Sequence, residues 1–495
     1  MSSETPSVWF ITGSQHLYGP ETLAKVAEHS QSVVNALSDD SAIPVRLVFK
    51  PVAKTAAEIS YLCADANVDS SCIGVVCWMH TFSPAKMWIA GLSALHKPLL
   101  HLHTQFNRDI PWDAIDMDFM NLNQSAHGDR EFGFIGARMG IARKIVVGHW
   151  EDPTVRADIA AWQRVALAQA ESRSLKVARF GDNMRDVAVT EGDKVEAQIQ
   201  FGWTVSGYGV GDLVQRVKAC AEAQVDELMS RYEDAYDFAS NVKQAGPVRN
   251  AVRYQARLEL ALRSFLDEHG CTAFTTTFED LHGLEQLPGL AAQRLMEAGY
   301  GFAGEGDWKT AALVRVMKVM ASNKGTSFME DYTYHLEPGN ESILGSHMLE
   351  VCPTIAATRP RVEVHPLSIG GKADPARLVF NGGQGAAVCA SIVDMGTRFR
   401  LIVSEVDAVN IEHDMPVLPV ARVLWKPRPS LRTAAQAWIL AGGAHHTGFS
   451  FEITSEQLSD WAGIAGIECV IIGKDTTAAS MRDALRWNEA AWKLR

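Results

Sequence analysis

The chain of 495 residues lacks several features that mark whole classes of protein. Its eight cysteines are scattered and form no CxxC pair, which indicates reduced thiols rather than a disulfide framework. Its apolar runs, such as Cys72–Met79, are far shorter than the roughly 20 residues of a membrane helix. The segment Met1–Pro6 has neither the basic nor the apolar part of an export signal. We therefore expect a cytoplasmic protein with no membrane segment.

Clustered positive charge is also missing. Lysine and arginine number 46 against 58 acidic residues, the net charge is −12, and no basic stripe is visible. A nucleic-acid partner is therefore not expected. Neither GxGxxG nor a P-loop occurs, which argues against a nucleotide-dependent kinase or dehydrogenase. The hydrophobic fraction of 47% is that of an ordinary globular protein, and the length predicts two or three domains.

The first third of the chain alternates β-branched runs with helical patterns, which predicts a parallel sheet. A long helix over 153–171 precedes a new strand over 175–180, so we place a domain boundary near residue 173. The next segment repeats the α/β texture, with strands expected at Lys194–Gln200 and Thr272–Thr277. After about residue 326, short strands dominate and predict a sandwich or barrel. The predicted domains are 1–173 (α/β), 174–326 (α/β) and 327–495 (β-rich).

Two predicted strands of the last domain carry polar side chains on apolar faces. Alternation over Ser327–His335 puts Glu330 on one face with Phe328, Tyr332 and Tyr334. A carboxylate there is costly unless it is paired or bound to a cation. The strand over 342–351 places His347 on an otherwise apolar face in the same way. A salt bridge and an ordinary core histidine are the alternatives, but neighbouring strands would bring the two side chains together.

Two glycine-rich turns hold further candidates. Glu305 lies among glycines just before a predicted helix, where a solvated acidic turn is the alternative. His445 and His446 follow a helix in another glycine-rich loop, and separate metal and substrate roles suit them better than one shared role. Two glutamates and two histidines suit Mn²⁺, Co²⁺, Fe²⁺ or Zn²⁺, and the absence of a thiolate ligand argues against structural zinc.

Several motifs resemble the L-arabinose isomerase family, in the same order and over essentially the whole chain. They are GSQHLYG (13–19), NQSAHGDRE (123–131), FGDNMR (180–185), GEGDWK (304–309), FMEDY (328–332), GSHMLE (345–350) and GGAHHT (442–447). Gly448 is a small departure, because a larger residue is expected after GGAHHT.

The resemblance implies a fold, a metal site and an assembly. The fold has two N-terminal Rossmann-like or flavodoxin-like α/β domains and a C-terminal β-barrel-like domain, as in L-fucose isomerase. One Mn²⁺ per subunit, with Co²⁺ as a possible substitute, is held by Glu305, Glu330, His347 and His446. The family forms homohexamers with active sites between subunits, and His127 matches a residue that reaches a neighbour's site. The positions that match sugar contacts are Gln15, Leu17, His127, Met184, Phe278, Tyr332, Ile369 and His445.

The implied activity is the isomerisation of L-arabinose to L-ribulose, the first step of L-arabinose catabolism, with D-galactose as a possible second substrate giving D-tagatose. Glu305 and Glu330 are the candidates for proton transfer through an enediolate, and a hydride shift is the alternative. An isomerase for L-fucose or D-galactose and a non-catalytic sugar-binding protein are the rival functions.

Overall fold

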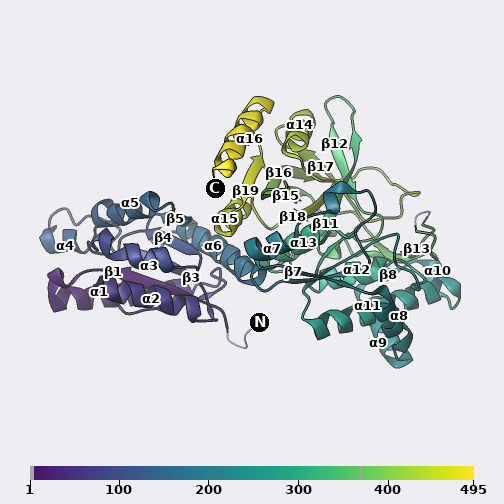
Figure 1. Cartoon of the computed structure of the whole chain (residues 1–495), viewed down its shortest axis with the longest axis horizontal. Helices are drawn as coiled ribbons and strands as arrows, with labels where there is room; N and C mark the ends of the chain where they lie inside the picture. The colour runs from purple at the N-terminus through teal and green to yellow at the C-terminus, as the bar shows by residue number, and fades with distance from the viewer. Residues whose placement is uncertain (1–4, 368–369, 495) are drawn as a thin grey trace. The chain divides into compact units, whose positions relative to one another are not determined.

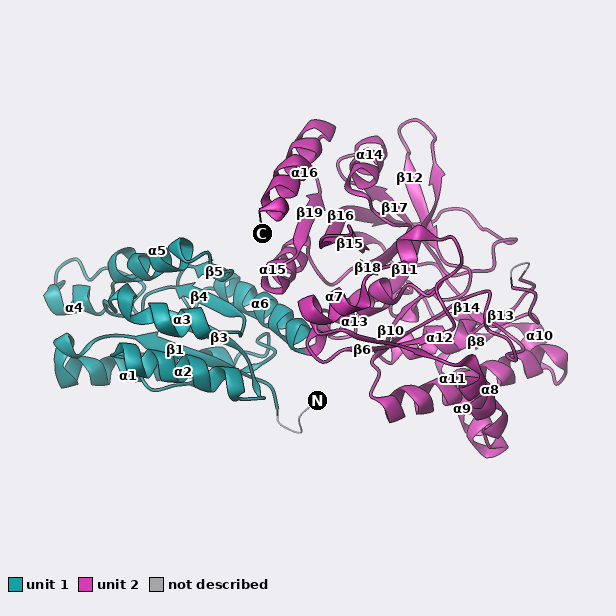
Figure 2. Cartoon of the chain, viewed as in Figure 1, with its two compact units in different colours: residues 1–170 teal, residues 171–495 magenta. Residues whose placement is uncertain are grey.

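The computed structural model describes residues 5–367 and 370–494. They fall into two compact units, 1–170 and 171–495, which helix α6 (Pro153–Ser172) connects in sequence (Figure 2). Among the described residues, none of the helices is both long and apolar enough to span a bilayer.

The first unit is built on one parallel sheet with the strand order β2-β1-β3-β4-β5 (Figure 1). Strands β1 and β3 are buried at every residue, as expected for a parallel sheet whose two faces are both covered by helices. The strands are β1 (Ser7–Gly13), β2 (Arg46–Phe49), β3 (Cys72–Met79), β4 (Leu99–His103) and β5 (Lys144–Val147). The helices are η1 (His16–Tyr18), α1 (Gly19–Ser38), α2 (Ala56–Val68), η2 (Ala85–Trp88), α3 (Ile89–Ala94), α4 (Met117–Asn121), η3 (Ser125–Asp129) and α5 (Arg130–Arg138).

The second unit begins with a four-stranded parallel sheet in the order β10-β9-β6-β7. Its strands are β6 (Lys176–Phe180), β7 (Thr204–Tyr208), β9 (Ala273–Thr276) and β10 (Gly301–Ala303). The helices of this part are η4 (Ala188–Thr190), α7 (Lys194–Phe201), α8 (Val210–Ala219), α9 (Glu222–Ala235), α10 (Ser240–Lys243), α11 (Pro247–His269), α12 (Gly289–Glu297) and α13 (Trp308–Met320). A small sheet in the order β14-β13-β8 lies in the same unit.

The rest of the second unit is a closed antiparallel barrel. Its strand order is β15-β18-β11-β12-β17-β16, and it closes because β15 also pairs with β16. Strand β19 extends β16 in parallel. The strands of this sheet are β11 (Thr326–His335), β12 (Ser342–Ser346), β15 (Gly385–Asp394), β16 (Phe399–Val409), β17 (Arg422–Pro427), β18 (His446–Ser450) and β19 (Glu468–Ile472). The separate small sheet consists of β8 (Asp237–Phe238), β13 (Arg361–Val364) and β14 (Ala376–Val379). The helices are η5 (Pro353–Ile355), α14 (Leu431–Ala441), α15 (Ser455–Ala465) and α16 (Ala478–Lys493).

The predicted architecture, two α/β parts followed by a barrel, is confirmed at this level. The exact domain limits stay a prediction, since the compact units divide the chain only once.

The predicted strand over Lys194–Gln200 is wrong, because this segment forms helix α7. Alternating apolar residues suggested a strand, but the buried ones, Ala197 and Phe201, are four apart. The Asp193 side chain accepts hydrogen bonds from the first turn, and Gly202 ends the helix in the left-handed conformation. These two end signals outweigh the alternation.

Helix α13 joins the central sheet to the barrel. It packs against β9 and β10 on one side and against β11, β15 and β18 on the other. Most of its residues are buried, as expected for a helix covered on several sides. Gly448 of β18 lies against it: a Cβ at that position would sit 2.4 Å from Met317 Sδ. The small residue therefore permits close packing of β18 on α13.

We expect Gly345→Ala to destabilise the barrel. A Cβ on Gly345 would lie 1.9 Å from the fully buried Trp425 ring, and such overpacking costs about 1–3 kcal/mol. The exposed Gly463 in α15, where an added Cβ would meet nothing within 4 Å, is the matched control, and alanine there should gain roughly 0.5–1 kcal/mol. The midpoint of thermal unfolding measures both changes. A Gly345→Ala midpoint equal to that of the parent would contradict the packing argument.

Candidate active site

Three barrel strands bring predicted ligands to one edge of the barrel. Glu330 on β11 lies opposite His446, the first residue of β18. On its other side Glu330 pairs with Ser346, the last residue of β12, and His347 follows directly. The expected proximity of Glu330 and His347 is therefore confirmed.

Glu305 comes from the loop between β10 and α13. Its φ is 60°, and its carbonyl accepts a 3.0 Å hydrogen bond from the Met184 N–H. Gly306 has a φ of 76°, and a Cβ there would lie 2.6 Å from the Asn183 Cα. The loop is thus pressed against the segment that carries Met184, in a conformation that favours glycine.

The loop carries Glu305 to the two histidines of β18 and its preceding turn. Glu305 Oε2 lies 3.8 Å from His446 Nε2 and 3.4 Å from His445 Nε2. One ligand atom from each of these three residues lies within 4.8 Å of the others. The His347 ring centre is 6.1 Å from that of His446, and the Phe328 ring packs edge-on against both imidazoles.

Two carboxylates orient the buried imidazoles. His446 Nδ1 is 3.1 Å from Asp307 Oδ2, and His347 Nδ1 is 2.5 Å from Glu350 Oε2. Each contact engages Nδ1 and directs Nε2 away from the carboxylate, which is how outer carboxylates position metal-binding histidines. Nε2 of His446 is buried and has no hydrogen-bond partner among the described residues.

The electrostatics keep Asp307 and Glu305 ionised. Burial opposes ionisation of Asp307, but the charge of Lys309 and the hydrogen bond from His446 outweigh it, so the pKa of Asp307 falls well below its ordinary value. Burial likewise opposes ionisation of Glu305. The hydrogen bond from His445 and the neighbouring imidazoles outweigh it, and the pKa of Glu305 is lowered.

The same balance holds for His347, whose charged form is the protonated one. Burial disfavours its protonation, but the charge and hydrogen bond of Glu350 outweigh burial and raise the pKa of His347. Nitrogen and oxygen donors therefore converge on one partly buried point. Such a group of donors can bind a divalent cation or exchange protons with a bound ligand.

The sugar contacts predicted in the second unit lie around this point. The Met184 N–H donates a hydrogen bond to the Glu305 carbonyl. The Phe278 ring is stacked on the His347 ring, with 6.2 Å between the ring centres. Tyr332 is half exposed, and burial together with the charges of Glu330 and Glu305 raises its pKa. Ile369 lies outside the described residues.

The predicted contacts of the first unit form a separate group there. Gln15 and the exposed Leu17 flank the start of η1, and the exposed His127 lies in η3. Gln124 bridges the two motifs, since its amide donates to the Tyr18 hydroxyl at 3.0 Å and its Oε1 lies 3.0 Å from His127 Nδ1.

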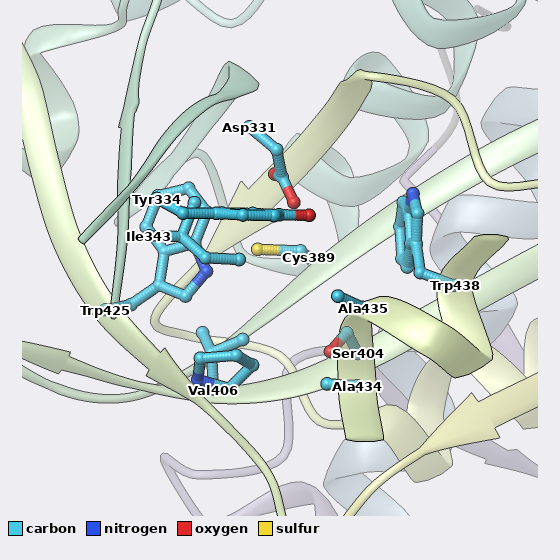
Figure 3. A pocket seen from close by; sticks show the side chains of 11 residues that line it. Asp331, Tyr334, Ile343, Cys389, Ser404, Val406, Trp425, Ala434, Ala435 and Trp438 are labelled. Atoms are coloured by element: carbon cyan, nitrogen blue, oxygen red, sulfur yellow. The ribbon is translucent and has the colours of Figure 1, made fainter. Parts of the chain in front are cut away.

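The predicted shared face of Glu330 and Tyr334 is wrong. The register of β11 against β12 shifts between Asp331 and Thr333, so alternation changes at the bulge. Tyr334 therefore lies with Asp331 at a small pocket between the barrel and α14, as Figure 3 shows. Strand β12 is also shorter than expected, since it ends at Ser346, so His347 belongs to the following loop.

Asp307 and Glu350 were not assigned a role from the sequence. Both stand in the quoted motifs, two residues after Glu305 and three after His347. A carboxylate this close in sequence to a candidate ligand is the feature of the sequence that could have indicated their positioning role.

The fold and the site together define a three-domain α/β protein with a carboxylate–imidazole centre beside a closed barrel. Family models for the L-arabinose isomerase N-terminal, central and C-terminal domains match residues 2–174, 176–323 and 325–468. An L-arabinose isomerase of Geobacillus stearothermophilus is 71% identical over 98% of both chains. L-arabinose isomerase 1 of Bacillus licheniformis is 62% identical over 100% of this chain and 99% of its own. The Bacillus subtilis L-arabinose isomerase is 60% identical over 98% of both chains.

The chain therefore belongs to the L-arabinose isomerase family and is an isomerase. The resemblance seen in the sequence motifs is confirmed.

We expect Gly306→Ala to displace the Glu305 loop. The side chain would meet the backbone of Asn183 and Asp182 in a left-handed conformation that disfavours alanine, at a cost of about 1–3 kcal/mol. Isomerase activity should fall together with the thermal midpoint. Gly209→Ala is the control, because its nearest neighbour, Asp212 Oδ2, is 3.9 Å from the added Cβ. Unchanged activity and stability of Gly306→Ala would contradict the proposed fit.

Proposed function

We propose that this enzyme interconverts L-arabinose and L-ribulose. The observation that carries the proposal is the match of relatives named L-arabinose isomerase over nearly the whole chain, with all three domain models in order. D-galactose, which would give D-tagatose, is the second substrate we propose. The enzyme would then catalyse the first step of L-arabinose catabolism.

The site suits one divalent metal ion, Mn²⁺ or its substitute Co²⁺. The buried, unpartnered Nε2 of His446 and the nearby Glu305 carboxylate support this fit, as do the carboxylates that engage Nδ1 of both buried histidines. We propose Glu305, Glu330, His347 and His446 as the ligands, with His445 left to contact the sugar. A bound cation would polarise the sugar carbonyl and stabilise negative charge on its oxygens.

Glu305 and Glu330 are proposed to move the proton. A carboxylate that stays ionised takes the C2 proton of the open-chain aldose, and an enediolate results. Return of a proton to C1, with transfer of the hydroxyl proton from O2 to O1, gives the ketose. The lowered pKa of Glu305 supports a basic role at neutral pH, while it also makes this carboxylate a weaker base. The Phe328 and Phe278 rings lie beside the His347 imidazole, and their apolar surfaces would limit water near a bound sugar.

We also propose a homohexameric assembly and a flavodoxin-like fold for the first unit. Gln15, Leu17 and His127 form one group in the first unit, and the exposure of Leu17 and His127 supports a role in a site shared between subunits of a homohexamer. The order β2-β1-β3-β4-β5 supports the flavodoxin-like description of the first sheet. The cytoplasmic location stays a prediction from the sequence.

Metal removal and return tests the proposed function. Enzyme stripped by a chelator should lose activity on L-arabinose, and Mn²⁺ or Co²⁺ should restore it more fully than Mg²⁺, because the donor set contains imidazoles.

D-galactose and L-fucose, assayed alongside, should be converted more slowly. Glu305→Gln should stay about 10²–10⁴-fold slower after metal return, whereas the exposed Glu337→Gln should match the parent. Full activity of the stripped enzyme would contradict the metal role, and preference for L-fucose would contradict the substrate.

Solvent isotope incorporation separates the two routes of hydrogen transfer. In D₂O the proton route should place deuterium at C1 of L-ribulose, because a carboxylate exchanges its proton with solvent before return. Nuclear magnetic resonance of the product measures the label. L-ribulose held in D₂O with Glu305→Gln controls for spontaneous exchange. Complete retention of the substrate hydrogen would overturn the proton route in favour of a hydride shift.

A further inference from the structure

A second group of potential metal ligands lies in the first unit, in the parallel sheet. His101 and His103 are two residues apart at the carboxyl end of β4, so they share one face of the sheet. Asp129 reaches them from the end of η3, directly before α5. In open α/β sheets, ligands bind beyond the carboxyl ends of the strands.

The three side chains converge on one point. His101 Nε2 is 2.7 Å from Asp129 Oδ2, and His103 Nδ1 contacts the same oxygen. One ligand atom from each residue lies within 4.8 Å of the other two. Metal–ligand bonds of about 2.0–2.2 Å would set such atoms roughly 3 Å apart, so a small expansion of the group would admit an ion.

The Asp129 carboxylate is poorly satisfied by the protein. Its side chain is fully buried, and Oδ1 has no hydrogen-bond partner among the described residues. Across 5–367 and 370–494, no lysine or arginine nitrogen forms an ion pair with it; its ion-pair contacts are the two histidines. A buried carboxylate in this position requires positive charge, which a protonated imidazole or a cation can supply.

We propose that His101, His103 and Asp129 bind a divalent first-row transition metal ion, at a site distinct from the carboxylate–imidazole centre beside the barrel. Two imidazoles and one carboxylate form a donor set that suits zinc, iron, cobalt or manganese better than calcium or magnesium. The His103 side chain is 21% exposed, which gives the ion a route from solvent. The ion would join the end of β4 to the start of α5.

Zinc binding tests the proposal in the full-length chain. The centre beside the barrel is first disabled by Glu305→Ala with His347→Ala, so that its own affinity does not contribute. Equilibrium dialysis at low micromolar free Zn²⁺, followed by metal analysis, should find one zinc per chain in this background. Adding His103→Gln should weaken binding more than about 100-fold, since loss of even an outer-shell partner costs roughly 10–100-fold.

Two further variants complete the test. His96→Gln, at an exposed histidine of the same unit, should leave zinc binding unchanged. Asp129→Asn should weaken it as His103→Gln does, and circular dichroism checks that each variant is folded. If the background binds no zinc, or if folded His103→Gln retains it, the proposal is overturned and the three side chains form only a proton-sharing hydrogen-bond group.

Discussion

The burial of α13 between the central sheet and the barrel is the contact on which the candidate active site depends. The helix packs on β9 and β10 and also on β11, β15 and β18. Its first turn is held by Asp307, which caps the helix and also contacts His446. The Glu305 loop is therefore attached to the same rigid element that supports β18. Because packed interiors deform little, the distance from Glu305 to His446 is set by this packing.

A chain of polar contacts continues from the helix into the site. Lys309 is buried beside Asp307, and its ammonium also donates to the carbonyls of Val189 and Glu191. This neighbour favours the ionised Asp307, which in turn fixes the orientation of His446. Asp307 thus links Lys309 of the helix to the His446 imidazole beside Glu305. These contacts restrict the orientation of the His446 ring and leave its Nε2 without a hydrogen-bond partner among the described residues.

The sequence was most informative where burial conflicts with polarity. Glu330 and His347 stood out because each interrupts an apolar pattern, and strand pairing does bring them together. Glu305 did not stand out, because an acidic residue in a glycine turn looks like a solvated one. The position of Glu305 depends on its contacts with Met184 and His446, two residues that are remote in sequence. These contacts form only when α13 packs. The β11 bulge was equally invisible, since the residue types of the strand do not show where its pairing with β12 shifts.

The proposed division of roles between His445 and His446 is consistent with the same packing. His446 begins β18, is fully buried and has Nδ1 engaged by Asp307, so only Nε2 can reach a ligand. His445 precedes the strand, is partly exposed and already contacts the Glu305 carboxylate through Nε2. A buried imidazole with one free nitrogen suits a fixed ligand, whereas a partly exposed one can adjust to a substrate. The start of β18, rather than residue type, therefore separates the two proposed functions.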